Sequence, residues 1–167
     1  MKLNAQKPRN FINPLLSRKA VDTEKFNVFK LALEHYKKSL ADQLSTKQTE
    51  PNIVTNTLKP FLDSFGFLSE ANSQKGQISI DLAVMQHSKP SVIIEAKMPN
   101  SADMILAHDL HKKSFCQAIM YFMNERAKNN TSLYHIIITD FNHWFVFDAK
   151  DFDRHFWRNA NIKKLLD

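Results

Sequence analysis

Three ionisable residues with strand-like spacing are the clearest chemical signal in this chain. Glu95 and Lys97 are separated by one residue, so on a β-strand both side chains project from the same face. Asp81 precedes Glu95 with thirteen residues between them, in a segment of alternating pattern. If residues 87–89 form the turn of a hairpin, Asp81 lies opposite Glu95. The spacing therefore predicts that two carboxylates and an amine converge on one face.

Two carboxylates on an otherwise apolar hairpin require a neutralising group. Burying Asp81 beside Glu95 is costly without a cation, and carboxylate oxygens are ligands that Mg²⁺ accepts. Lys97 beside such a metal could orient or deprotonate an attacking water, while the metal screens the charge that develops on a phosphate. The alternative is a structural cross-strand ion pair between Asp81 and Lys97, worth less than about 1 kcal/mol if exposed.

The arrangement of Asp81 and Glu95-Ala96-Lys97 resembles the active-site motif of the PD-(D/E)xK nuclease superfamily, with Ile80 in place of the motif's Pro. A second copy of the motif's ending, Asp148-Ala149-Lys150, lies at the end of a later predicted strand. Only Glu95-Ala96-Lys97 follows a hairpin partner with an acidic residue on the matching face. We therefore assign the motif to the first copy and expect the second to be a solvated strand exit.

Two further matches extend the resemblance. Gln117 and Tyr121, four apart on one helix face, are similar to the QxxxY motif of the RecB-like and type I restriction subunit branches. A second segment resembles the first core helix of the type I restriction (HsdR) nuclease domain, in which the Glu approaches the metal; its residues are Thr49, Glu50, Pro60, Leu62, Gly66 and Phe67. Gln117 and Tyr121 could instead border the core, and Glu50 could simply favour a helix N-terminus.

The resemblance covers residues 49 to 148. It implies a Mg²⁺-dependent endonuclease domain, with Mn²⁺ able to substitute, that hydrolyses double-stranded DNA like the cleavage modules of type I and type IIG restriction-modification enzymes. Hydrolysis would be metal-assisted and without a covalent intermediate. The implied roles are metal binding by Asp81 and Glu95, water positioning by Lys97, assistance to the metal by Glu50, and contact with the phosphate backbone or bracing of Lys97 by Gln117 and Tyr121.

The elements that would position these residues follow from hydrophobic periodicity. Steps of three and four predict a helix from Asp22, its N-cap, to Ser45, after an extended arm at 1–21. A second helix over 51–65 is expected to kink at Pro60 and to stop at Gly66.

The period then changes to two, which predicts a half-buried strand over 77–86, a turn at 87–90 and a second strand over 91–97. Further expected elements are a helix over 102–128, strands over 134–139 and 143–148, a short helix over 152–157 and the start of a helix within 161–167. With the resemblance, this order predicts an α/β fold: a restriction-endonuclease-like α/β/α core with a mixed sheet of four to five strands. The core is expected at 49–167, with an N-terminal arm and extra helix at 1–48 packed on it.

The length and composition of the chain exclude several classes of protein. A length of 167 residues indicates one compact domain, and no apolar run is long enough to span a bilayer. The single cysteine excludes an intramolecular disulfide or a cysteine zinc cluster, and two isolated glycines exclude a P-loop or a GxGxxG turn. We therefore expect a cytoplasmic protein without a membrane partner.

The net charge of +6 permits a polyanionic partner. Candidates for contacts to the DNA backbone, chosen by charge and position, are Lys75, Lys112, Lys113, Arg154 and Arg158. Such contacts carry no sequence information. We therefore expect specificity to come from further domains or subunits beyond Asp167, of methyltransferase, helicase or specificity type.

Two other functions fit the same residues. One is a catalytically silent nucleic-acid-binding or subunit-docking module of the same fold, with the first helix as its docking face. The other is a DNA repair or recombination nuclease, which the sequence does not separate from a restriction enzyme. Divalent metal binding distinguishes the nuclease from the docking module.

Overall fold

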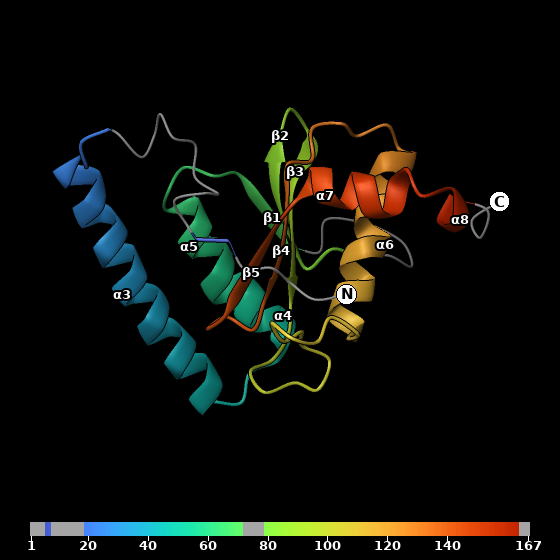
Figure 1. The fold of residues 1–167 in the computed structure, drawn as a ribbon. Helices are drawn as coiled ribbons and strands as arrows, with labels where there is room; N and C mark the ends of the chain where they lie inside the picture. Colours follow the sequence, from blue (N-terminus) through green and yellow to red (C-terminus); the bar gives the residue numbers. More distant parts are fainter. Residues whose placement is uncertain (1–5, 8–18, 72–78, 164–167) are drawn as a thin grey trace.

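The computed structural model describes residues 6–7, 19–71 and 79–163 of the chain. These residues form three layers, in which a mixed sheet of five strands lies between two layers of helices (Figure 1). The predicted α/β class, with a mixed sheet flanked by helices, is thereby confirmed.

The sheet has the strand order β1-β2-β3-β4-β5. Strands β3 and β4 pair in parallel and are joined through α6, whereas the other neighbouring pairs are antiparallel. The predicted strands over 134–139 and 143–148 are confirmed to within one residue. Strand β1 was not predicted, because three residues are too few to show an alternation. The bounds are β1 Ser69–Ala71, β2 Leu82–Gln86, β3 Lys89–Ala96, β4 His135–Thr139 and β5 Trp144–Asp148.

The β2–β3 hairpin reaches the predicted register through a different turn. His87 and Ser88 both have positive φ, 50° and 60°, which is typical of a tight two-residue hairpin turn, so the predicted longer turn is wrong. A register shift between Val84 and Met85 compensates, and Leu82 pairs with Ile94. Continuing this register by one residue places Asp81 opposite Glu95, although Asp81 precedes β2. The predicted strand over 77–86 starts too early, because residues 79–81 are not in a strand; residues 77 and 78 lie outside the described residues.

The central strands are buried on both faces. Leu82 and Ala83 of β2 point to opposite faces and are both fully buried, so the prediction of a half-buried strand over 77–86 is wrong. Ile93 and Ile94 point to opposite faces, and both are fully buried. On the face of Ile93 the core includes Phe122 of α6 (Lys113–Ala127) and Phe152 of α7 (Ala149–Phe152). On the face of Ile94 the core is formed with the N-terminal helices. Because helices cover both faces of the sheet, apolar residues occupy consecutive positions along the central strands and not only every second position.

Helix α3 (Thr23–Ser45) confirms the first predicted helix and its cap, because the Asp22 side chain accepts hydrogen bonds from two backbone N–H groups of the first turn. Its C-terminal half packs on the core through Tyr36 and Leu40. The Tyr36 hydroxyl donates a hydrogen bond of 2.7 Å to the carbonyl of Phe141, between β4 and β5. Most of the predicted arm at 1–21 lies outside the described residues.

The second helical segment continues through Pro60 without interruption. It runs through α4 (Glu50–Ile53), the π-helix η1 (Val54–Leu58) and α5 (Lys59–Asp63). Pro60 has no N–H to donate, and the wider π turn immediately before it absorbs the mismatch without a break. Gly66 ends the segment with φ of 81°, as predicted.

The segment between β3 and α6 is a loop, so the predicted helix over 102–128 is wrong for residues 102–112. Met104, Ile105 and Leu110 are buried there one by one, and Leu106 and Asp109 form an isolated β-bridge. Apolar residues in a loop can have the spacing of a helix when separate tertiary contacts bury each of them.

The C-terminal helix begins earlier than predicted. Asp148 caps α7, which continues into the π-helix η2 (Asp153–Trp157) and is followed by α8 (Ala160–Lys163). The remainder of the helix expected within 161–167 lies outside the described residues.

Candidate active site

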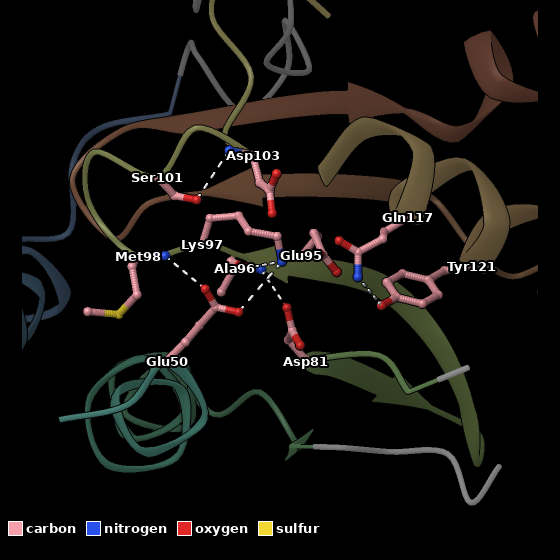
Figure 2. Close-up of polar contacts among 10 residues, drawn as sticks. All are labelled: Glu50, Asp81, Glu95, Ala96, Lys97, Met98, Ser101, Asp103, Gln117 and Tyr121. Atoms are coloured by element: carbon pink, nitrogen blue, oxygen red, sulfur yellow. Dashed lines mark hydrogen bonds and ion pairs between the residues drawn. The ribbon is translucent and has the colours of Figure 1, made fainter. Parts of the chain in front are cut away.

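The candidate site lies at the C-terminal end of β3 (Figure 2). The backbone N–H of Ala96 donates to Oδ2 of Asp81 at 2.8 Å, and that of Lys97 donates to the carbonyl of Thr139 at 2.8 Å. Hydrogen bonds from two neighbouring segments thus fix the backbone on either side of the Ala96–Lys97 bond. The Asp81 carboxylate lies directly against the strand end that carries Glu95.

Glu95 and Lys97 form a buried ion pair. Glu95 is fully buried and Lys97 is 7% exposed. The Lys97 ammonium donates to Oε1 of Glu95 and, at 2.8 Å, to the carbonyl of Ala96. Within the described part of the chain, the buried Oε2 of Glu95 has no hydrogen-bond partner. One oxygen of this carboxylate is paired with Lys97. The other makes no hydrogen bond of standard geometry in the described structure, although the Tyr121 hydroxyl lies close enough to the Glu95 carboxylate to lower its pKa.

Glu50 approaches Lys97 from the other side. It is the first residue of α4, and its Oε2 accepts a hydrogen bond of 2.8 Å from the backbone N–H of Met98. Its Oε1 lies 3.5 Å from Nζ of Lys97. The Lys97 ammonium is thus held between the carboxylates of Glu95 and Glu50 (Figure 2).

Helix α6 places two of the predicted residues beside Glu95. Nε2 of Gln117 donates to the Tyr121 hydroxyl at 3.4 Å, and Tyr121 is 4% exposed. Figure 2 shows both side chains on the flank of the site where Glu95 lies. Oε1 of Gln117 and Oγ of Ser114 are buried without a hydrogen-bond partner among the described residues. Sequence reasoning missed Ser114, although its position three residues before Gln117 puts it on the same helix face.

The second motif copy, Asp148-Ala149-Lys150, does not join the site. Asp148 pairs with His135 at the start of β4, whereas the site lies beside Thr139 at the end of β4. Oδ1 of Asp148 accepts a hydrogen bond of 2.8 Å from the backbone N–H of Lys150, so this Asp caps α7. Gln117 and Tyr121 thus lie beside Glu95, whereas Asp148 lies at the other end of β4.

Burial and like charge shape the protonation of the site. Burial raises the pKa of Glu95 to about 8, and the charge of Asp81 adds to this effect against the opposing charge of Lys97. Burial also raises the pKa of Glu50, with Lys97 opposing it. Burial would lower the pKa of Lys97, but Glu95 and Glu50 outweigh it and raise that pKa above its ordinary value. Burial and the charge of Glu95 raise the pKa of the Tyr121 hydroxyl.

A family model described as a domain of unknown function, DUF7149, matches residues 6–167. The chain belongs to the DUF7149 family. Comparisons with curated proteins and with solved structures find no match for it. No helix in the described part of the DUF7149 chain has the length and apolar character needed to cross a membrane.

The described residues of the DUF7149 chain contain no group of three or more His, Cys, Asp and Glu side chains arranged to hold a metal ion. Asp81 and Glu95 lie together, but the Lys97 ammonium separates Glu50 from Glu95. The carboxylates that this fold brings together thus form a pair, with a third carboxylate on the far side of the lysine.

The candidate DNA-contacting residues lie on α6 and on the C-terminal helical segment that packs along it. Lys112 and Lys113 lie where α6 begins, after the loop that leaves the site, and Lys112 is 3.5 Å from Oδ2 of Asp109. Arg154 lies in η2 and Arg158 follows it, next to Phe156, whose ring contacts Phe115 of α6; Arg154 pairs with Asp151. The position predicted for Lys75 lies outside the described residues.

The raised pKa of Glu95 predicts a specific pH dependence of stability without metal. Between the ordinary pKa of a glutamate and about 8, the folded state keeps a proton on Glu95 that the unfolded chain releases. The free energy of unfolding should therefore fall through this range, by at most about 1.4 kcal/mol per pH unit. Urea unfolding of the wild type and of Glu95→Gln at pH 5, 6.5 and 8 gives the free energy of unfolding of each protein. The difference between the two proteins at each pH isolates the contribution of Glu95. A difference that does not change with pH would contradict the prediction.

Proposed function

We propose that this DUF7149 chain is the cleavage module of a Mg²⁺-dependent DNA endonuclease with a restriction-endonuclease-like core, similar to those of type I and type IIG restriction-modification enzymes. The observation that carries the proposal is Glu95, a fully buried carboxylate opposite Asp81 whose Oε2 makes no hydrogen bond of standard geometry in the described structure. Its other oxygen is paired with Lys97, the amine that the nuclease motif requires. A buried acceptor beside a like charge is costly in a purely structural role.

The residues present fit a magnesium ion. Mg²⁺ keeps several waters and is usually held by one or two carboxylates together with substrate phosphates, so the pair Asp81 and Glu95 is a sufficient protein contribution. The unpaired Oε2 of Glu95 is an available oxygen ligand. When bound, Mg²⁺ would supply a Lewis acid that screens the charge developing on the scissile phosphate.

The surrounding side chains have separate tasks in this proposal. Lys97, fixed through its own backbone and its ammonium, orients the water that attacks the phosphorus. Tyr121 covers the flank of Glu95 and keeps bulk water from it, and Gln117 holds the Tyr121 hydroxyl. Lys113, exposed at the start of α6, contacts the phosphate backbone of double-stranded DNA.

A docking role has one observation in its favour. The N-terminal half of α3 exposes large apolar side chains, including Phe26 at 45%, Val28 at 47% and Leu31 at 67%. Such an exposed helix face is suited to contact with another domain or subunit. We propose docking as an addition to catalysis, because a silent module would have no use for the unpaired carboxylate oxygen of Glu95. A repair or recombination nuclease would use the same site.

Divalent cations should raise the thermal unfolding midpoint of the protein. A cation at about 100 times its Kd contributes about 2.7 kcal/mol, which for a chain of this size raises the midpoint by roughly 5–10 °C. Asp81→Asn should lose most of this gain while keeping an oxygen that accepts the Ala96 N–H. Differential scanning calorimetry with Mg²⁺, Mn²⁺ and EDTA measures the effect.

The exposed substitution Asp42→Asn on α3 is the matched control and should leave the gain unchanged. Midpoints that neither Mg²⁺ nor Mn²⁺ moves would show that Asp81 and Glu95 do not bind a metal. The docking alternative would then be favoured.

A further inference from the structure

Both carboxylate oxygens of Glu50 are engaged by the segment that leaves β3. Oε2 accepts the backbone N–H of Met98 at 2.8 Å, and Oε1 lies 3.5 Å from the Lys97 ammonium. In Figure 2 the Glu50 carboxylate lies on the opposite side of Lys97 from Glu95. These contacts leave Glu50 facing an ammonium group, where a metal ligand would face the metal.

Glu50 lies at a less buried position than Glu95, at the start of a helix. Glu50 is the first residue of α4, whose N-cap Thr49 makes no side-chain hydrogen bond to the helix. A carboxylate in the first turn is stabilised by the partial positive charge of the helix N-terminus. With a side chain 25% exposed, Glu50 is also better solvated than the fully buried Glu95. Of the two carboxylates that contact Lys97, Glu50 is thus the more exposed one and the one that lies outside the pair Asp81 and Glu95.

A cation bound to Asp81 and Glu95 would leave Lys97 without the counter-charge of Glu95, and Glu50 can replace that counter-charge. Of its two carboxylate partners, the Lys97 ammonium lies closer to Glu95. A divalent cation that takes over the Glu95 carboxylate would repel a lysine with no other counter-charge. Glu50, already in contact with the same ammonium, offers that counter-charge on the side away from Glu95.

We propose that Glu50 is a positioning residue rather than a metal ligand: it anchors the Lys97 ammonium at the strand end, so that the lysine keeps its place when a divalent cation binds Asp81 and Glu95. This inference rests on the proposed function and replaces the assistance to the metal that the family resemblance implies for Glu50. The Met98 N–H fixes the Glu50 carboxylate, and the carboxylate in turn fixes Lys97.

The first test compares metal affinity with the rate of cleavage. Glu50→Gln keeps an oxygen for the Met98 N–H and removes the charge, and Glu34→Gln, exposed on α3, is the matched control. Mn²⁺ binding is measured by electron paramagnetic resonance, and plasmid nicking is measured at saturating Mn²⁺. We expect Glu50→Gln to keep the Mn²⁺ Kd within about two-fold of wild type and to lower the maximal nicking rate about ten-fold or more.

The benchmark for a true ligand is Glu95→Gln, which should weaken Mn²⁺ binding about ten-fold or more. A Glu50→Gln protein that loses Mn²⁺ affinity to the same degree would overturn the inference, because Glu50 would then be a ligand. The proposed function would survive that result.

The second test needs no activity. A double-mutant cycle of Glu50→Gln and Lys97→Met, followed by thermal midpoint, should show coupling between the two side chains without metal. The coupling should grow by about 2–4 °C with saturating Mn²⁺, as Lys97 comes to depend on Glu50 alone. Absence of coupling in the metal-free protein would overturn the inference whatever the metal result. A wild-type protein that binds no Mn²⁺ would instead overturn the proposed function, and the metal-free cycle would still decide whether Glu50 anchors Lys97.

Discussion

Glu95→Gln is expected to reduce Mg²⁺-dependent nicking of supercoiled plasmid DNA by about a thousand-fold or more, which removes the activity in practice. The substitution keeps the size of the side chain and removes the charge that would hold the cation. Because the Glu95 carboxylate is fully buried and costly to ionise, the fold should persist without it. Rates with Mg²⁺ and with EDTA, from initial loss of the supercoiled form, give the measurement.

The second copy of the motif provides the matched control. Asp148→Asn should leave the nicking rate within a few-fold of wild type, because Asp148 only caps α7 and Asn is an equally good N-cap. If Asp148→Asn is inactive and Glu95→Gln is active, the active centre lies at Asp148 and the proposal is wrong.

Lys97→Met should destabilise the metal-free protein by about 3 kcal/mol at pH above 8. The ammonium is the counter-charge that contacts both Glu95 and Glu50, and removing one partner of a buried ion pair leaves the other uncompensated. Met keeps an unbranched side chain of similar length, so little of the loss should come from a cavity. Urea unfolding at fixed pH, with EDTA present, measures the free energy of unfolding.

Adding Glu95→Gln to Lys97→Met should recover most of the lost stability, because the carboxylate that needs a counter-charge is then absent. If Lys97→Met alone is as stable as wild type, the lysine is not the group that neutralises these carboxylates. The comparison also shows under which conditions the Lys97 variant is folded. Only there does a loss of DNA cleavage report on the role of Lys97 in catalysis.

Local periodicity was sufficient to predict the two halves of the candidate site. Alternation along β3 put Glu95 on one face and Ile94 on the other, because successive strand residues point in opposite directions. Helical spacing put Gln117 and Tyr121 on one face of α6, since residues four apart are neighbours on a helix. Each of these relations depends on residues close in sequence.

Other features of the fold were not predictable because long-range contacts decide them. Residues 102–112 have helix-like apolar spacing, but Met104 and Leu110 are buried separately in the core of the sheet and the backbone between them is not helical. The turn after β2 is shorter than predicted, and only the compensating register shift near Met85 restores the pairing beside Asp81. The predicted pairing of Asp81 with Glu95 was therefore correct, although the predicted turn was too long and the register shift was not predicted.

Residue types and spacing were enough to indicate the residues of the candidate site, because both are local properties of single elements. They placed a carboxylate and an amine at the end of one strand and a carboxylate on the strand before it. How these charges are neutralised depends on contacts between elements that are distant in the sequence. Glu50 meets Lys97 and Met98 because the packing of α4 against the sheet brings its first turn to the end of β3. The resulting burial, which no residue pattern encodes, leaves one oxygen of Glu95 without a hydrogen bond of standard geometry in the described structure.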